Sequence, residues 1–194
     1  MITPAVTTHL LKITLAHVRP PIWRRLAVPS DTSLARLHAV MQLAFGWQDS
    51  HLHEFKVGDA RYGVPGPDDE ELLDEAEVTV ADVLPRKTSR LEYVYDLGDF
   101  WIHNVSVEHI EAAPASGGSR SMRPRHRPGV ITCLDGARAA PPEDCGGPAG
   151  YSELLEALAD ERHPRHAELR EWIGADFDAE RFVIADINRR LAAL

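Results

Sequence analysis

The sequence predicts one α+β domain over residues 1–194, with a largely antiparallel sheet packed against helices and a helical C-terminal third. Three observations support this fold class. Strand-like segments dominate the first two-thirds of the chain, helical periodicity dominates after residue 150, and no internal repeat or change of composition marks a domain boundary. A chain of 194 residues can also bury a core without disulfides or a structural metal.

The N-terminal segment predicts two strands separated by a break. Residues 8–19 carry apolar side chains on one face, at Leu11, Ile13 and Leu15. Pro20 and Pro21 interrupt this pattern, because proline cannot donate a hydrogen bond to a sheet. A short second strand follows, with its apolar face at Ile22, Leu26 and Val28.

The segment SDTSLARLHAVMQLAFGW predicts a helix with clear ends. Thr32 or Ser33 is the expected N-cap, and Gly46 suits the position after the last helical residue. His38 lies one position from the apolar stripe of this helix. We interpret it as a hydrogen-bonded residue at the edge of the core rather than as a metal ligand.

Residues 51–110 predict strands separated by an acidic loop. A hairpin is expected over 51–64, with its turn beginning at 58–59, and two further strands over 89–110 divide at 96–98. Between them, 65–77 is rich in acidic residues and opens with proline and glycine. This composition is typical of a mobile surface loop.

The remaining chain predicts loops followed by helices. Residues 111–129 have the composition of a loop, and a last short strand is expected at 130–133. Residues 134–151 contain too much glycine and proline for regular structure. Helices are predicted over 151–160, 164–173 and 177–194.

The composition favours a cytoplasmic location without membrane association. No apolar run approaches the ~20 residues that a membrane span needs. The N-terminal segment lacks the basic region of a signal peptide, and two cysteines are too few for a secreted disulfide scaffold.

The charge distribution disfavours nucleic acid as a partner. The net charge is −9, and residues 61–118 hold thirteen acidic against four basic side chains. An acidic chain does not gain the counterion-release affinity that supports non-specific DNA binding. One basic cluster lies in the loop 119–127 and consists of Arg120, Arg123, Arg125 and Arg127. It is either a solvated loop or a phosphate contact.

The stretch SHLHEF holds a candidate metal pair. On a regular strand, His51 and His53 point to the same, more apolar face, and Glu54 points to the other. Two imidazoles are too few for a zinc site, which needs three or four ligands. In the later strand, Asp99 and His103 share a face, and either would complete the set if the two strands pair.

The predicted metal ligands are therefore His51, His53 and His103, around a divalent ion that the residue types do not identify further. Two alternatives stay open. The histidines pack beside Trp47, Tyr93 and Trp101 and form ordinary hydrogen bonds, or they line a polar pocket without metal.

The string PPEDCGG is expected to fix the direction of the two carboxylates that it contains. The prolines before these acidic residues make the backbone rigid, and the glycines after them allow it to turn. Glu143 and Asp144 are expected to cap the next helix, to pair with Arg24 or Arg25, or to contact a ligand. The predicted ligand pocket consists of Trp47, Asp99, Trp101, Glu143 and Asp144.

Three blocks of sequence together resemble the plasmid pRiA4b ORF-3-like family. They are PPIWRRLAVPSDTSLARLHAVMQLAFGWQDSHLHEF, YDLGDFWIHNVSVE and CLDGARAAPPEDCGGPAGY. The resemblance implies a compact α+β fold found in bacteria, archaea and mobile elements, with no established activity. Some family members carry labels taken from a TnpR-like passenger gene of an insertion element, but nothing here resembles a resolvase nucleophile motif. The loop 119–127 looks like a variable insertion and inherits no family role.

Three functional hypotheses follow. The first is a mobile-element-associated cytoplasmic accessory protein that binds an unknown protein or small ligand, without proven catalysis. The second is a metal-dependent hydrolase, with a metal-bound water as nucleophile and Asp99 or Glu143 as base. The third is nucleic-acid binding through 119–127.

Overall fold

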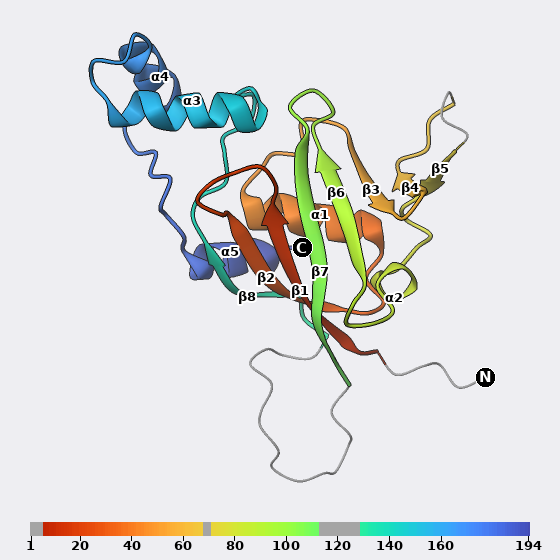
Figure 1. Cartoon of the computed structure of the whole chain (residues 1–194). Coiled ribbons are helices and arrows are strands. Elements are labelled where there is room, and N and C mark those ends of the chain that lie inside the picture. Colours follow the sequence, from red (N-terminus) through yellow and green to blue (C-terminus); the bar gives the residue numbers. More distant parts are fainter. Residues whose placement is uncertain (1–5, 68–70, 113–128) are drawn as a thin grey trace, which may run out of the picture.

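The computed structural model describes residues 6–67, 71–112 and 129–194 (Figure 1). The described residues form an eight-stranded sheet in the order β5-β4-β3-β6-β7-β1-β2-β8. Its strands are β1 (Thr8–Leu15), β2 (Trp23–Pro29), β3 (His53–Val57), β4 (Ala60–Gly63), β5 (Leu72–Asp74), β6 (Arg90–Tyr95), β7 (Trp101–Glu111) and β8 (Thr132–Ala137). Every neighbouring pair is antiparallel except β4 and β5.

Five helices accompany the sheet in the described part of the chain: α1 (Leu34–Phe45), α2 (Val80–Val83), α3 (Gly147–Ala159), α4 (His166–Ile173) and α5 (Ile184–Leu191). Helices α1 and α5 contact each other and lie on one face of the sheet, whereas α3 and α4 form a pair set apart from it (Figure 1). None of the described helices is long and apolar enough to span a membrane. The predicted α+β class, with a mostly antiparallel sheet, is confirmed.

The predicted N-terminal half matches the structure closely. Leu11 and Ile13 of β1 are fully buried, as their alternation requires. Ser33 is the N-cap of α1 and accepts a hydrogen bond from the Arg36 backbone. Gly46 ends this helix in the left-handed region at φ 85° and donates its N–H to the Gln42 carbonyl.

Two predictions for irregular segments are wrong. Residues 71–77 are not a loose loop, because β5 pairs with β4 and the carboxylate of Glu75 is buried. Strand β8 extends to Ala137, beyond the predicted 130–133. Helix α3 begins at Gly147, inside the segment that looked too rich in glycine and proline for regular structure.

Tertiary contacts explain why β8 forms despite its glycine. The strand pairs with β2. The side-chain amide of Asn188 in α5 accepts from the Cys133 backbone N–H at 2.7 Å and donates to the Cys133 carbonyl at 2.9 Å. Gly136 lies against Phe182, and a Cβ at Gly136 would come within 2.5 Å of that ring. The glycine is therefore required for α5 and its preceding segment to close over β8.

Candidate functional site

The two histidines of SHLHEF lie in different side-chain groups. His53 begins β3, whereas His51 lies in a bend two residues earlier. The potential metal-ligating groups in the described part of the chain are His38 with Asp49 and His53, and His51 with Asp96 and Asp144. His103 is fully buried and belongs to neither group. The structure therefore does not gather His51, His53 and His103 around one point.

The first group is a closed hydrogen-bonded ring. His38 Nε2 lies 2.9 Å from Asp49 Oδ1, and its Nδ1 lies 2.7 Å from the Tyr93 hydroxyl. Gln42 donates to that hydroxyl and accepts from the Asp49 backbone N–H. All four residues are satisfied when His38 carries its proton on Nε2 and accepts from Tyr93 at Nδ1. Burial, together with nearby His53, lowers the pKa of His38, which favours this neutral form.

The stacking of His38 on His53 argues against a shared ion. Their ring centroids are 3.5 Å apart and their planes differ by 5°. A metal lies close to the plane of each imidazole that binds it, about 2 Å from the nitrogen. Two parallel rings at this separation cannot both direct a lone pair at one ion, so the pair is better suited to hydrogen bonding. His53 in turn contacts Glu75, with 2.9 Å between Nε2 and Oε2.

In the second group, His51 lies near the carboxylates of Asp96 and Asp144, and the carboxylate of Glu143 lies near it as well. Its Nδ1 lies 3.7 Å from Asp96, and its Nε2 lies 3.1 Å from Asp144 and 3.6 Å from Glu143. Despite these short approaches, the Nε2 atom is buried without a well-oriented hydrogen-bond partner. Ligands that share an ion at ~2.0–2.2 Å lie within about 4.4 Å of one another. The ligand atoms of His51, Asp96 and Asp144 all lie within 4.8 Å, so a small adjustment brings them into coordination range.

Loops at two distant places in the sequence position this group. Asp96 lies in the turn between β6 and β7, where its other oxygen accepts from the backbone N–H groups of Gly98 and Asp99. Asp96 and Asp144 both adopt left-handed backbone conformations, at φ 58° and 59°. Such conformations cost energy in residues other than glycine and are often found at functional sites.

Glu143 is held by two donors. The Gln48 backbone N–H and the Tyr95 hydroxyl donate to its Oε1, at 2.7 and 3.0 Å. Burial raises the pKa of Tyr95 to about 12, so this hydroxyl keeps its proton at neutral pH. The second oxygen of Glu143 therefore stays directed at His51.

The predicted ligand pocket is divided between two roles. Glu143 and Asp144 join His51, as described. Trp47 and Trp101 are buried, and the indole N–H of Trp47 donates to the Pro141 carbonyl at 2.9 Å. Asp99 accepts from the Gly146 backbone N–H at 3.1 Å and thereby holds the loop that carries Asp144.

The expected pairing of Glu143 or Asp144 with an arginine does not occur in the described structure. Arg25 instead pairs with Glu108 and Asp135, and Arg24 bonds only backbone carbonyls. Glu54 faces away from His53 and pairs with Lys56 and Arg61, as the strand alternation predicts. The predicted phosphate contacts, Arg120, Arg123, Arg125 and Arg127, lie outside the described residues.

Sequence reasoning missed Asp96 as a partner of His51, and Asp49 and Glu75 as partners of the buried histidines. Asp96 carried one usable signal, because an Asp-Leu-Gly turn between two strong strands often contains a left-handed residue. Glu75 carried none, since it stands among six other acidic residues in 65–77.

Replacing Gly150 by alanine should disturb the loop that carries Glu143 and Asp144. A Cβ at Gly150 would lie 1.9 Å from the Cys145 carbonyl oxygen, so the start of α3 must separate from that loop. We expect a loss of about 1–3 kcal/mol in the free energy of unfolding, measured by chemical denaturation. Gly66→Ala is the control, because a Cβ there meets nothing within 4 Å. Equal losses in both variants would contradict the close contact.

Comparison with known proteins gives consistent matches. Residues 7–186 match the family model described as plasmid pRiA4b ORF-3-like protein. An uncharacterised protein, y4hQ of Sinorhizobium fredii (strain NBRC 101917 / NGR234), is 39% identical over 185 residues, covering 92% of this chain and 88% of that protein.

A solved structure shows the same fold. The crystal structure of MM3350 from Methanosarcina mazei Go1, a protein of unknown function, superposes with a TM-score of 0.79 at 33% identity. The match covers 94% of this chain and 98% of that one. This solved structure agrees with the architecture described above, and the names of both relatives assign no activity.

Proposed function

The chain belongs to the plasmid pRiA4b ORF-3-like family, and we propose that it is a cation-binding accessory protein whose centre is His51 with three carboxylates. The carboxylates are those of Asp96, Glu143 and Asp144. One observation carries the proposal: the buried Nε2 of His51 lies between two carboxylates without an oriented hydrogen bond. A nitrogen lone pair in that position is suited to a metal ion.

The charge balance supports a divalent ion. Three carboxylates within 3.7 Å of one imidazole repel one another, and a divalent cation would compensate most of that charge. A mixed set of imidazole and carboxylate ligands suits manganese, iron or zinc. Binding is tested at pH 8, where an ordinary imidazole is neutral and can bind a metal.

The cellular setting is part of the same proposal. We place the protein in the bacterial cytoplasm, as an accessory protein associated with mobile elements. The plasmid reading frame in the family description supports the association with mobile elements, and the low cysteine content supports a reducing compartment. Its partner in this role is a protein or a small ligand.

Metal-dependent hydrolysis is a second candidate, favoured by one feature. Glu143 borders both the His51 group and a cleft of about 390 Å³. Of the two bases considered from the sequence, Glu143 is favoured because its second oxygen lies 3.6 Å from His51 Nε2, whereas Asp99 bonds the Gly146 backbone outside this group. Glu143 would be the base if a bound metal supplied an activated water. This activity requires the cation, so it fails if cation binding fails.

Calorimetric titration of Mn²⁺ and Zn²⁺ into EDTA-stripped protein at pH 8 tests the proposal. We expect one equivalent of at least one ion to bind. His51→Gln and Asp144→Asn should each weaken binding at least tenfold, because each removes one ligand from the set. Asp144 is a suitable target because its side chain is 73% exposed, so the substitution is not expected to disturb the core.

Two control variants separate the possible outcomes. His109→Gln removes an exposed histidine of β7 and should leave affinity unchanged. His53→Gln tests the stacked group, and a larger loss there than in His51→Gln would place the ion at the wrong group for this proposal. Absence of binding by either ion at millimolar concentration would also contradict it.

A further inference from the structure

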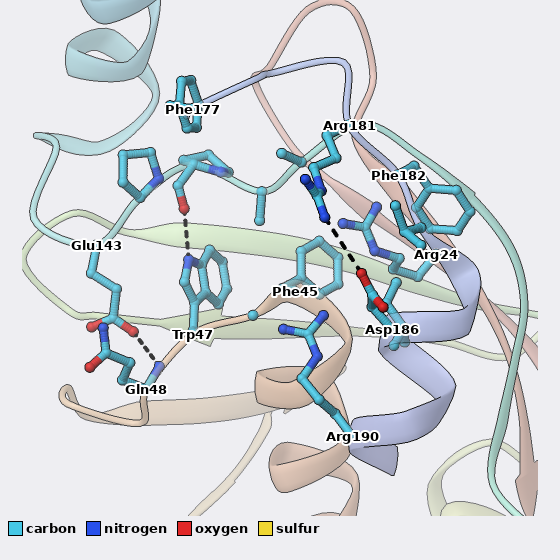
Figure 2. A pocket seen from close by; sticks show the side chains of 17 residues that line it. Arg24, Phe45, Trp47, Gln48, Glu143, Phe177, Arg181, Phe182, Asp186 and Arg190 are labelled. Atoms are coloured by element: carbon cyan, nitrogen blue, oxygen red, sulfur yellow. Dashed lines mark hydrogen bonds and ion pairs between the residues drawn. The ribbon is translucent and has the colours of Figure 1, made fainter. Parts of the chain in front are cut away.

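A cleft of about 390 Å³ opens between the end of α1, the loop 139–143 and the segment 177–190 (Figure 2). Its volume lies within the range of small-molecule sites. Aromatic side chains line it together with three arginines: Phe45, Trp47, Phe177, Phe182, Arg24, Arg181 and Arg190. This combination of rings and cations suggests what the cleft binds.

Arg24 is a buried cation without a carboxylate partner among the described residues. Arg24 is 3% exposed. Its guanidinium carbon Cζ lies 5.0 Å from the centroid of the Phe45 ring and 5.1 Å from that of the Phe182 ring. Nε donates to the Ala44 carbonyl, and Nη1 donates to the carbonyls of Trp23 and Ala137. These carbonyls accept from three of the guanidinium N–H groups, but they do not neutralise a buried charge.

Two further arginines add positive charge to the same cleft. Arg190 forms no ion pair within the described residues, and its Nη1 reaches over Gly46, 3.1 Å from where a Cβ would stand. Among the residues that the structure describes, Arg181 has one ion pair, a long contact of 3.6 Å to Asp186, which also pairs with Arg189 at 3.1 Å. Burial lowers the pKa of Arg24 to about 10, and the charge of Arg190 contributes to that lowering.

The carboxylates that border the cleft are already engaged. Glu143 accepts from Gln48 and Tyr95, and Asp186 is shared by two arginines. Figure 2 shows the guanidinium groups of Arg24, Arg181 and Arg190 around one space, with only the Asp186 carboxylate close to them. In a chain of net charge −9, this local excess of positive charge is suited to an anion.

We propose that this cleft binds a small organic oxyanion, a phosphate or carboxylate attached to a planar apolar group. The guanidinium groups would hold the oxyanion, because their geometry matches phosphate and carboxylate oxygens. Phe45, Trp47 and Phe177 would contact the apolar part. The proposal does not depend on cation binding at His51, although Glu143 borders both sites.

Calorimetric titration of three probes tests it: phenyl phosphate, benzoate and inorganic phosphate, at low salt with EDTA present. We expect phenyl phosphate or benzoate to bind at least fivefold more tightly than inorganic phosphate, because only the organic anions use the rings. The stronger of the two organic probes identifies which oxyanion the cleft prefers. Inorganic phosphate binding as tightly as phenyl phosphate would contradict the role of the rings.

Arg190→Gln should weaken the binding of the stronger probe at least fivefold. Arg170→Gln is the matched control, because it removes the same charge from an exposed arginine of α4, and Arg170 does not line the cleft. Equal losses in the two variants would show a general charge effect and overturn the site, as would no binding of any probe at millimolar concentration. EDTA and the Asp144→Asn variant should leave the affinity unchanged, which keeps this test separate from that of the cation.

Discussion

Replacing Tyr93 by phenylalanine should lower the free energy of unfolding by about 2–6 kcal/mol. The hydroxyl of Tyr93 is the common partner of His38 Nδ1 and Gln42 Nε2, at 2.7 and 2.9 Å. Both partners are buried, so removal of one oxygen leaves two polar groups without a hydrogen bond or access to water. Each such group costs about 1–3 kcal/mol, which is more than the hydrogen bond itself contributes.

Urea denaturation of the parent and the variant measures this effect. Tyr62→Phe is the matched control, because it removes the same atom from a half-buried tyrosine on β4 whose hydroxyl makes no hydrogen bond in the described part of the chain. We expect the control to change stability by less than about 0.5 kcal/mol. A Tyr93→Phe loss as small as that of the control would show that the hydrogen-bonded ring around His38 contributes little.

Replacing His103 by leucine should flatten the acid dependence of stability. Burial lowers the pKa of His103 to about 3, far below its ordinary value of 6.5. As pH falls below 6.5, His103 becomes protonated in the unfolded chain but stays neutral in the folded protein. The free energy of unfolding of the parent therefore decreases down to about pH 3. At 1.36 kcal/mol for each pH unit, the contribution lost between pH 6.5 and 4.5 is roughly 3 kcal/mol.

The measurement is the difference in unfolding free energy between His103→Leu and the parent, taken at pH 7 and at pH 4.5. His9 and His38 also have pKa values lowered by burial, but both are present in the two proteins and cancel in the difference. The difference should shift by roughly 3 kcal/mol in favour of the variant on acidification. His109→Leu, an exposed position on the same strand, is the control. Parallel stability curves for His103→Leu and the parent would contradict the prediction.

Local signals predicted most of the fold because they act over a few residues. The cap at Ser33, the left-handed glycine after α1 and the alternation in β1 each require only neighbours in sequence. Predictions failed where a distant segment supplied the missing partners. Strand β8 forms through β2 and Asn188, and β5 forms through β4, so composition alone pointed to loops there.

The candidate site shows the same division. Glu143 and Asp144 were identifiable, because prolines and glycines around them fix the chain direction. The separation of His51 from His53 could not be predicted, since it depends on the residue at which β3 begins. Pairing of β3 with β6 starts at His53 and Tyr95, and the Asp96 N–H bonds the Leu52 carbonyl. His51 therefore lies outside the strand and turns toward Asp96 instead of following His53.

The sequence by itself determined the α+β class, most element positions and the residue types available for a cation site. It also placed His51, Glu143 and Asp144 among the candidates. Only the tertiary structure decided that His51 and His53 separate, that His53 stacks on His38, and that three arginines from β2, α5 and the segment before α5 line one cleft. Periodicity specifies the face of an element on which a side chain lies. The neighbours of that side chain depend on how distant segments pack, as for Arg24 and Arg190, which line one cleft although they are 166 positions apart in the sequence.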